Sequence, residues 1–362
     1  MIEETRHTFY KRLSSIGSPL RVQIEVTRRC NLRCVHCILG SSPDTTGELR
    51  AEDYVGLIKS LRAAGVFNVY LTGGEFLAHP EGLEILSLFL ESDFCLSLQS
   101  NGTLIDEEAL RMMLGRKEKI RTVALSIYGA TADVHEAVTR TPGSFEKTIA
   151  AARALRENGF RVEFITLLMT INHHQYDEIK KLGEGLGSKH QFNSVLTPSH
   201  DGNRELAGLR LPEALLAKLP RPWESFMNNY WEQPLEEFGP DMPLAAWCSM
   251  GRTTGYIDAR GNVLPCSILN TPAGNVRETP FNEIWEASPV LKKIRSLKIG
   301  DFECSRCSHF PTCRPCPGLA HFEHGDLFSP PREICRIIEV FLGKKKETPV
   351  EEEKDLLKTG AN

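Results

Sequence analysis

Three closely spaced cysteines are the residues of this chain best suited to redox chemistry. Cys30, Cys34 and Cys37 form a C-x3-C-x2-C motif just after the apolar, strand-like run Val22–Val26. A [4Fe–4S] cluster has four irons, so three thiolates leave one iron without a protein ligand. That iron can bind a small molecule and pass it an electron, whereas a structural zinc site takes four ligands and a closed shell. The spacing therefore predicts a redox-active iron–sulfur centre.

A glycine-rich motif follows the next strand-like run. Gly73, Gly74 and Glu75 come directly after residues 68–71. Two glycines allow close approach of another backbone, and a carboxylate accepts hydrogen bonds from an ammonium group. The alternative interpretation, a plain turn, is common for such tripeptides. Its position one helix and one strand after the cysteine motif favours a binding role.

Short polar side chains end the two strand-like runs after that. Ser100 and Asn101 end the third run, and Ser126 ends the fourth. Hydroxyl and amide groups there can hydrogen-bond ribose hydroxyls or a carboxylate. Because ligands of parallel α/β sheets gather at the carboxyl ends of the strands, we expect these residues near one site. The alternative for Asn101, which precedes a glycine, is a simple turn.

These motifs, in this order, resemble the radical S-adenosylmethionine (SAM) superfamily. His36 fits as well, since that family usually has an aromatic residue or His before the last cysteine. The resemblance implies that Cys30, Cys34 and Cys37 hold a [4Fe–4S] cluster whose open iron binds SAM. His36 is accordingly expected among the SAM-binding residues.

The same resemblance assigns further SAM contacts. Gly73, Gly74 and Glu75 are implied to bind the methionine amino group of SAM. Ser126 and Arg140 are implied to contact its carboxylate. The alternative for Arg140 is a solvated surface charge.

Seven more cysteines lie in the C-terminal third, at Cys248, Cys266, Cys304, Cys307, Cys313, Cys316 and Cys335. Their pattern of Gly-x4-Cys, C-x2-C-x5-C-x2-C and an isolated last cysteine resembles the SPASM extension of peptide-modifying radical SAM enzymes. One departure is the two residues, rather than three, between Cys313 and Cys316. Two C-x2-C pairs are also typical of a zinc site, but zinc would leave three of the seven cysteines without a role.

The SPASM resemblance implies two auxiliary [4Fe–4S] clusters. One would be held completely by four cysteines: Cys304, Cys307, Cys313 and Cys335. The other would be held by three: Cys248, Cys266 and Cys316. Its fourth site would be open, or filled by a ligand other than cysteine or by the substrate.

Strand-like and helix-like runs alternate over the first half of the chain. The six strand-like runs are Val22–Val26, Asn68–Leu71, Cys95–Leu98, Thr122–Ile127, Val162–Met169 and Gln191–Leu196. Such alternation predicts an α/β fold with a parallel sheet and right-handed crossovers. With the resemblance, the expected fold class is a partial (β/α)6 TIM-like barrel followed by a small Cys-rich SPASM domain.

The chain is expected to divide into five consecutive segments. They are an N-terminal extension (1–20), the radical SAM barrel (21–196), a bridging region (197–246), the SPASM auxiliary-cluster domain (247–343) and a charged tail expected to be disordered (344–362).

Composition excludes several classes of function. The chain has 362 residues, with 43 Lys and Arg against 47 Asp and Glu, so its net charge of −4 gives no reason to expect nucleic acid as a partner. No stretch is long and apolar enough to cross a membrane, and the N-terminus has no apolar signal core. Eleven cysteines without an export signal favour metal or redox use in the cytoplasm.

The resulting hypothesis is an enzyme that reductively cleaves SAM to a 5′-deoxyadenosyl radical and abstracts hydrogen from a peptide. Segments 126–145 and 313–320 resemble ribosomal-peptide maturases, which implies a thioether or C–C crosslink in a ribosomally made peptide. Only about twenty residues precede the barrel, so a separate leader-binding protein is expected. A flavodoxin or ferredoxin-type protein is the expected reductant. No residue is identified as the catalytic acid or base.

Three alternatives stay open from the sequence. Related SPASM-like enzymes mature haem or quinone cofactors, and others mature sulfatases. A non-catalytic iron–sulfur electron carrier or a zinc-stabilised binding module belongs to a different class. An electron carrier needs no SAM site, so the combined Cys and Gly-Gly-Glu motifs argue against it.

Overall fold

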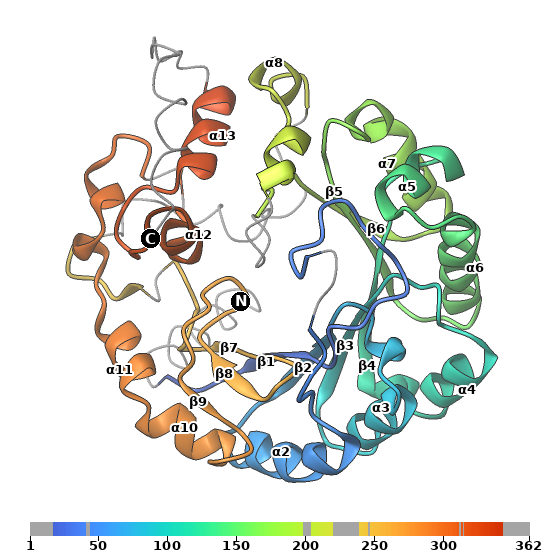
Figure 1. Ribbon diagram of the computed structural model, residues 1–362, viewed down its shortest axis with the longest axis horizontal. Coiled ribbons are helices and arrows are strands. Elements are labelled where there is room, and N and C mark those ends of the chain that lie inside the picture. The colour runs from blue at the N-terminus through green and yellow to red at the C-terminus, as the bar shows by residue number, and fades with distance from the viewer. Residues whose placement is uncertain are drawn as a thin grey trace, which may run out of the picture.

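The strands form one curved, largely parallel sheet. The computed structural model describes residues 17–40, 44–197, 204–219, 239–244, 247–310, 313 and 315–342 (Figure 1). Within them nine strands pair in the order β6-β5-β4-β3-β2-β1-β7-β8-β9. Their bounds are Arg21–Glu25 (β1), Asn68–Thr72 (β2), Cys95–Ser100 (β3), Ile120–Ser126 (β4), Val162–Leu167 (β5), Lys189–Asn193 (β6), Thr254–Ile257 (β7), Asn262–Leu264 (β8) and Gly274–Asn275 (β9). All pairs from β6 to β7 are parallel, and β8 and β9 are antiparallel additions.

Helices connect and cover these strands. They are α2 (Ala51–Ala63), α3 (Gly82–Leu90), α4 (Glu107–Gly115), α5 (Ala132–Thr139), α6 (Ser144–Glu157), α7 (Tyr176–Gly185), α8 (Glu213–Leu216), α10 (Phe281–Ala287), α11 (Pro289–Ser296), α12 (Pro317–His324) and α13 (Arg332–Leu342). Helices α2, α3, α4 and α6 lie along the outer face of the curved sheet (Figure 1). The predicted partial (β/α)6 barrel is confirmed in β1–β6 and their crossover helices.

Local sequence explains where several helices begin and end. The Asp106 side chain accepts a hydrogen bond from the Ala109 amide at 2.9 Å and so caps the start of α4. Helices α2 and α6 stop just before Gly65 and Gly159, whose φ angles of +80° and +72° suit glycine. These are the boundaries that the capping and glycine signals predict.

The sixth strand ends earlier than its apolar pattern predicts. The run Gln191–Leu196 suggested a strand to Leu196, but β6 stops at Asn193. The Asn193 side chain accepts a hydrogen bond from the Val195 amide at 2.9 Å, which forms an Asx turn and ends the strand.

The cysteine-rich C-terminal segment adds strands to the barrel sheet, which the sequence did not predict. Strand β7 pairs in parallel with β1, with Arg21 opposite Thr254 and Ile24 opposite Ile257. The β7–β8 pair then continues the sheet beyond β1. Strand β1, which leads into the first cysteine motif, therefore has hydrogen-bonded neighbours on both sides.

Of the three apolar cores in the described residues, two support the main sheet and the C-terminal segment. The larger core lies between sheet and helices and includes the fully buried Ile24, Leu71 and Phe164. A smaller core around Trp247 and Phe302 lies within the C-terminal segment. In the described part of the chain no helix has the length and hydropathy of a membrane span.

Some predicted segments lie outside the described residues. They are residues 1–16 of the N-terminal extension, residues 198–203, 220–238 and 245–246 of the bridging region, and the tail at 344–362.

Candidate functional site

The loop after β1 gathers the three cysteines of the first motif. Burial, followed by the neighbouring thiolates of Cys30 and Cys37, raises the pKa of the Cys34 thiol. Burial raises the pKa of Cys30 too, and Cys37 contributes to that increase. The three sulfurs are therefore close enough to repel one another as thiolates. Without a bound cation, burial and this repulsion disfavour the charged form that a metal centre requires.

The loop is fixed against helix α5, an element that the sequence did not predict. The Arg33 amide donates to the Thr139 carbonyl at 3.0 Å, and the Val35 amide donates to the Val138 carbonyl at 2.9 Å. Both acceptors belong to the last turn of α5. The end of α5 therefore sets the position of the cysteine loop.

The two glycines after β2 let their backbone lie against the start of the cysteine loop. A Cβ added to Gly73 would lie 2.5 Å from the Thr27 carbonyl oxygen, and one added to Gly74 would lie 2.5 Å from that of Arg29. The Gly74 amide donates to the Thr27 carbonyl and the Glu75 amide to the Arg29 carbonyl, both at 2.8 Å. These glycines thus permit a close approach to the protein's own backbone.

Glu75 is buried and bonded within the protein. Its carboxylate accepts hydrogen bonds from Ser100 Oγ at 2.9 Å, from the Asn101 amide at 2.7 Å and from the Leu77 amide at 3.4 Å. Burial raises its pKa to about 7. The carboxylate thereby ties the end of β2 to the end of β3. A contact between this carboxylate and the ammonium group of SAM stays a prediction.

Asn101 reaches the first cysteine. Its Nδ2 donates to Asn31 Oδ1 at 3.0 Å and lies 3.8 Å from the sulfur of Cys30. Gly102 follows with a φ of +82°, so the expected turn is also present. The turn and the contact with the cysteine loop therefore occur together at the end of β3.

His36 and Ser126 meet at a tyrosine that the sequence did not single out. The His36 ring lies 4.6 Å from the Tyr128 ring, and its Nε2 is 3.1 Å from the Tyr128 hydroxyl. Ser126 also hydrogen-bonds the Tyr128 side chain. Burial lowers the pKa of His36 to about 4, so its ring is neutral near pH 7. Its buried Nδ1 has no hydrogen-bond partner among the described residues.

Arg140 has an unusual backbone beside this loop. It is exposed and directly follows the Thr139 carbonyl that binds the cysteine loop. Its φ of 52° is the one positive φ of a non-glycine residue in the described ranges. Such strain is uncommon and concentrates at functional sites. The structure brings Arg140 to the edge of the site, and its contact with SAM stays a prediction.

Three C-terminal cysteines form one set. Burial, followed by the nearby thiolates of Cys316 and Cys266, raises the pKa of Cys248. Burial and then Cys316 raise the pKa of Cys266 to about 11. The backbone amide of Leu269 donates to the Cys266 sulfur at 3.3 Å. The structure thus brings together the three cysteines that the SPASM resemblance assigns to one cluster, and their binding of it stays a prediction.

Four other cysteines form a second set. Burial, followed by the thiolates of Cys335 and Cys307, raises the pKa of Cys304 to about 12. Burial and then the same neighbours, with Cys304, raise the pKa of Cys313 to about 12. The structure thus brings together the four cysteines predicted to share a cluster. Their binding of a cluster stays a prediction.

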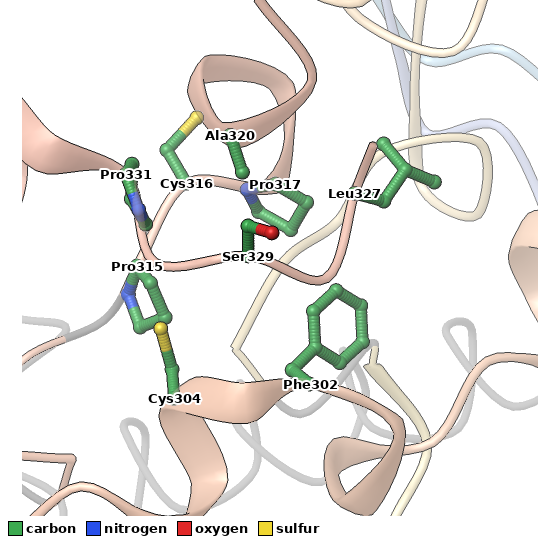
Figure 2. Close-up of a pocket in the computed structure, with 9 residues that line it drawn as sticks. All are labelled: Phe302, Cys304, Pro315, Cys316, Pro317, Ala320, Leu327, Ser329 and Pro331. Carbon is green, nitrogen blue, oxygen red and sulfur yellow. The ribbon is translucent and has the colours of Figure 1, made fainter. Parts of the chain in front are cut away.

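The two C-terminal sets border one small apolar hollow. Figure 2 shows Cys304 below the hollow and Cys316 above it, with Pro315 between the two cysteines and Phe302 and Leu327 on the opposite side. Apart from the cysteines, Phe302 and Leu327, the lining consists of three prolines, an alanine and a serine: Pro315, Pro317, Pro331, Ala320 and Ser329. The hollow therefore lies at the boundary of the two predicted auxiliary sites.

The all-thiolate donor sets of the three cysteine groups suit iron–sulfur clusters. In the part of the chain that the structure describes, no three His, Cys, Asp or Glu side chains converge as the ligands of one metal ion. The cysteines of a [4Fe–4S] cluster bind different irons, whereas the ligands of zinc bind one ion. Cationic irons would also offset the burial and repulsion that raise these thiol pKa values.

Two family models match parts of this chain. Residues 24–184 match the radical SAM superfamily, and residues 248–317 match SPASM, an iron–sulfur cluster-binding domain. An AdoMet-dependent heme synthase of Methanosarcina barkeri is 27% identical over 87% of this chain and 95% of its own. Mycofactocin maturase MftC of Mycobacterium ulcerans is 28% identical over 92% of this chain and 90% of its own.

A solved structure shares the fold. Streptococcus suis SuiB bound to its precursor peptide SuiA superposes with a TM-score of 0.63 at 17% identity, over 91% of this chain and 78% of SuiB. At that identity the likeness concerns the fold alone. The two family matches and the three cysteine groups lead to the same conclusion: residues 24–184 form a radical SAM domain and residues 248–317 a SPASM domain.

Proposed function

We propose that this enzyme reductively cleaves SAM and abstracts hydrogen from a peptide, installing a thioether or C–C crosslink. The observation that carries the proposal is the meeting of Cys30, Cys34 and Cys37 with the ends of β2, β3 and α5. An electron carrier has no need of that arrangement. A thiol triplet beside polar strand ends suits a cluster that also binds a small molecule.

In this proposal the three cysteines of the first motif hold a [4Fe–4S] cluster, which supplies the electron that breaks the sulfonium bond of SAM. The chain's own residues position and shield that reaction. Asn101 holds the Cys30 side of the loop, and Tyr128 orients the neutral His36 ring. The guanidinium group of Arg140, at the edge of the site, would pair with the SAM carboxylate. The buried surroundings of Tyr128 exclude water from this side of the site.

The C-terminal cysteines extend the proposal. Two sets of thiols with four and three members suit two auxiliary clusters. The set of three would hold a cluster with one iron open to a substrate thiolate, and the set of four would hold a cluster able to act as an electron acceptor. Both roles belong to a reaction that oxidises its substrate by two electrons.

The names of related proteins support a peptide as the substrate. One relative is a mycofactocin maturase, and another, 27% identical, takes part in the biosynthesis of the bacteriocin subtilosin in Bacillus subtilis. A protein of the same fold was solved with its precursor peptide. A separate leader-binding protein and a flavodoxin or ferredoxin-type reductant complete the proposed system.

A second candidate is haem maturation. Relatives named AdoMet-dependent heme synthase match nearly their whole length, 95% in the case of Methanosarcina barkeri. Such a function would use the same SAM site and the same cysteine groups. The two candidates therefore differ in the substrate rather than in the metal centres.

Iron analysis tests the shared part of the proposal. The protein would be reconstituted without oxygen, as wild type and as a Cys30/Cys34/Cys37→Ala variant. Three clusters predict on the order of twelve irons per chain in wild type and about eight in the variant. Wild type alone should change its EPR spectrum with SAM and cleave SAM when a reductant is added. About four irons together with zinc would contradict two auxiliary clusters.

Substrate assays separate the two candidates. Coexpression with a short cysteine-containing peptide encoded next to the gene should lower the peptide mass by two hydrogens. The cysteine-to-alanine variant is the control and should leave the mass unchanged. SAM cleavage that is coupled to a haem precursor, with the peptide mass unchanged, would support haem maturation instead.

A further inference from the structure

A buried carboxylate connects β1 to the C-terminal segment. Glu25, on β1, is 3% exposed. The Tyr256 hydroxyl on β7 donates to its Oε2 at 2.6 Å, and the Ala259 amide donates to its Oε1 at 3.4 Å. Arg28 Nε donates to the same Oε1 at 3.0 Å. This carboxylate therefore contacts both the C-terminal hairpin and the side chain of Arg28, two residues before Cys30.

A second buried carboxylate holds the same stretch from another side. Glu48 accepts hydrogen bonds from Thr27 Oγ1 at 3.0 Å and from the Arg28 amide at 2.7 Å. Its side chain is 6% exposed and also pairs with Arg29 at 3.3 Å. Three consecutive residues leading to Cys30 are thus bonded to one side chain.

The C-terminal segment also fixes the backbone that carries Glu48. The Leu49 amide donates to the Ala259 carbonyl at 2.7 Å. Arg277 donates through Nη1 to the Gly47 carbonyl at 2.8 Å and through Nη2 to the Glu48 carbonyl at 2.9 Å. The C-terminal segment that contains the SPASM domain (here the SPASM segment) therefore contacts both Glu25 and the backbone at Glu48. Each of these two residues in turn contacts the residues that precede Cys30.

We infer that Glu25 and Tyr256 are positioning residues for the SAM-binding cluster, through which the SPASM segment sets the geometry of the loop that carries Cys30. The inference rests on the proposed function, in which Cys30 is a ligand of that cluster. A buried carboxylate must keep its hydrogen-bond donors, since a missing donor leaves the charge poorly solvated. Hydrogen bonds are directional, so those of Glu25 favour one position of the hairpin relative to the loop. Apolar contacts alone would allow a wider range of positions.

Hydrogen exchange in the reconstituted full chain tests this inference with a matched pair of variants. Tyr256→Phe removes the hydroxyl that donates to Glu25, whereas Tyr54→Phe removes a buried hydroxyl with no hydrogen-bond partner among the described residues. We expect the amides of Arg28, Arg33 and Val35 to exchange about tenfold faster in Tyr256→Phe, the low end of the effect of losing a hydrogen bond to a charged group. Tyr54→Phe should match wild type at these amides. Equal exchange in all three proteins would overturn the inference.

A double-mutant comparison asks whether the two residues act through one bond. Glu25→Gln, Tyr256→Phe and the double variant would be reconstituted to equal iron content. Each single change should shift the EPR spectrum of the SAM-bound cluster, and the double variant should shift it no further. Additive shifts, or spectra like that of Tyr54→Phe, would contradict a shared positioning role.

The failure of this inference is distinguishable from that of the proposed function. Absence of iron at Cys30, Cys34 and Cys37 in wild type would refute the function, whereas unchanged exchange in an iron-loaded Tyr256→Phe would refute the positioning role. If Tyr256→Phe does not fold, Glu25→Gln is the second variant. It replaces the carboxylate that accepts from Tyr256 and Arg28 with an amide of similar size, and it should raise exchange at the Arg28 amide. Wild-type exchange at that amide would then overturn the inference.

Discussion

Burial sets the protonation of two side chains beside the first cysteine motif. It lowers the pKa of His36 to about 4 and raises the pKa of Glu75 to about 7. His36 is therefore a neutral ring at the pH where Glu75 changes its charge. The hydrogen-bond donors on Glu75 oppose the effect of burial but do not cancel it.

The raised pKa of Glu75 predicts that the stability of the protein depends on pH. Its folded pKa of about 7 lies above the ordinary value of 4.5, so the folded state binds the proton more tightly than the unfolded state. This stabilisation is fully present below pH 4.5 and is lost as the pH rises through 7. Relative to Glu75→Gln, wild type should lose up to about 3 kcal/mol of unfolding free energy over that interval. Denaturant unfolding at a series of pH values measures the difference.

Glu84→Gln is the control for this experiment, because Glu84 is an exposed carboxylate on the neighbouring helix α3. Its stability should follow that of wild type at every pH. If wild type and Glu75→Gln also stay parallel between pH 4.5 and 8, the carboxyl of Glu75 does not titrate as its burial implies.

Arg140 allows its backbone and its charge to be tested separately. Arg140→Gly relieves the positive φ, whereas Arg140→Ala keeps it, so the Gly variant should be more stable by about 1 kcal/mol. Both variants lack the guanidinium group and should bind SAM equally weakly. Thermal unfolding and SAM titration measure the two effects. A Gly variant that binds SAM like wild type would exclude a role for the charge.

The functional residues that the sequence alone identified are those whose partners in the site lie close to them in the chain. Cys30, Cys34 and Cys37 share one loop, so their spacing alone indicates a metal centre. Glu25 and Tyr256 were missed because they lie 231 residues apart and look like ordinary polar and aromatic strand positions. Only the tertiary structure brings such pairs together.

At the scale of the elements, the end of β2 packs against the start of the cysteine loop so closely that no side chain fits between them. Gly74→Ala would place a Cβ 2.5 Å from the Arg29 carbonyl oxygen. We expect the loop to shift, at a cost of about 1–3 kcal/mol in stability, and the first motif to lose its iron, about four atoms per chain. Iron analysis and the SAM-dependent EPR change measure this loss.

Gly115→Ala is the matched control, since Gly115 ends helix α4 and an added Cβ there meets nothing within 4 Å. Alanine at this position should keep all the iron and can stabilise the helix slightly. Full iron in both variants would show that the close approach at Gly74 does not control the cysteine loop.

The sequence predicted the elements with strong local signals. All six barrel strands are present because their apolar runs are bounded by caps and turns. Helix α5 escaped prediction because it has only eight residues, and β7 to β9 because they have two to four. The pairing of β7 with β1 depends on contacts across most of the chain, which local patterns do not encode.

For the whole molecule, the proposed auxiliary clusters are expected to provide much of the stability of the C-terminal segment. That segment has short elements and a small core around Trp247, and bound metal contributes its binding energy to folding. A strong iron chelator should therefore lower the unfolding temperature of the Cys30/Cys34/Cys37→Ala variant nearly as much as that of wild type. Calorimetry measures both. A variant insensitive to the chelator would contradict this expectation.

The pairing of β1 with β7 has a consequence for biosynthesis. While the ribosome makes the chain, β1 and the first cysteine motif emerge long before Tyr256, which lies 231 residues beyond Glu25. Domains generally fold as they are synthesised, and such distant contacts form late. In the nascent chain the first motif therefore lacks the contacts of β1 with β7 until most of the protein has left the ribosome. Delivery of iron to this motif should accordingly succeed mainly after translation has passed β7.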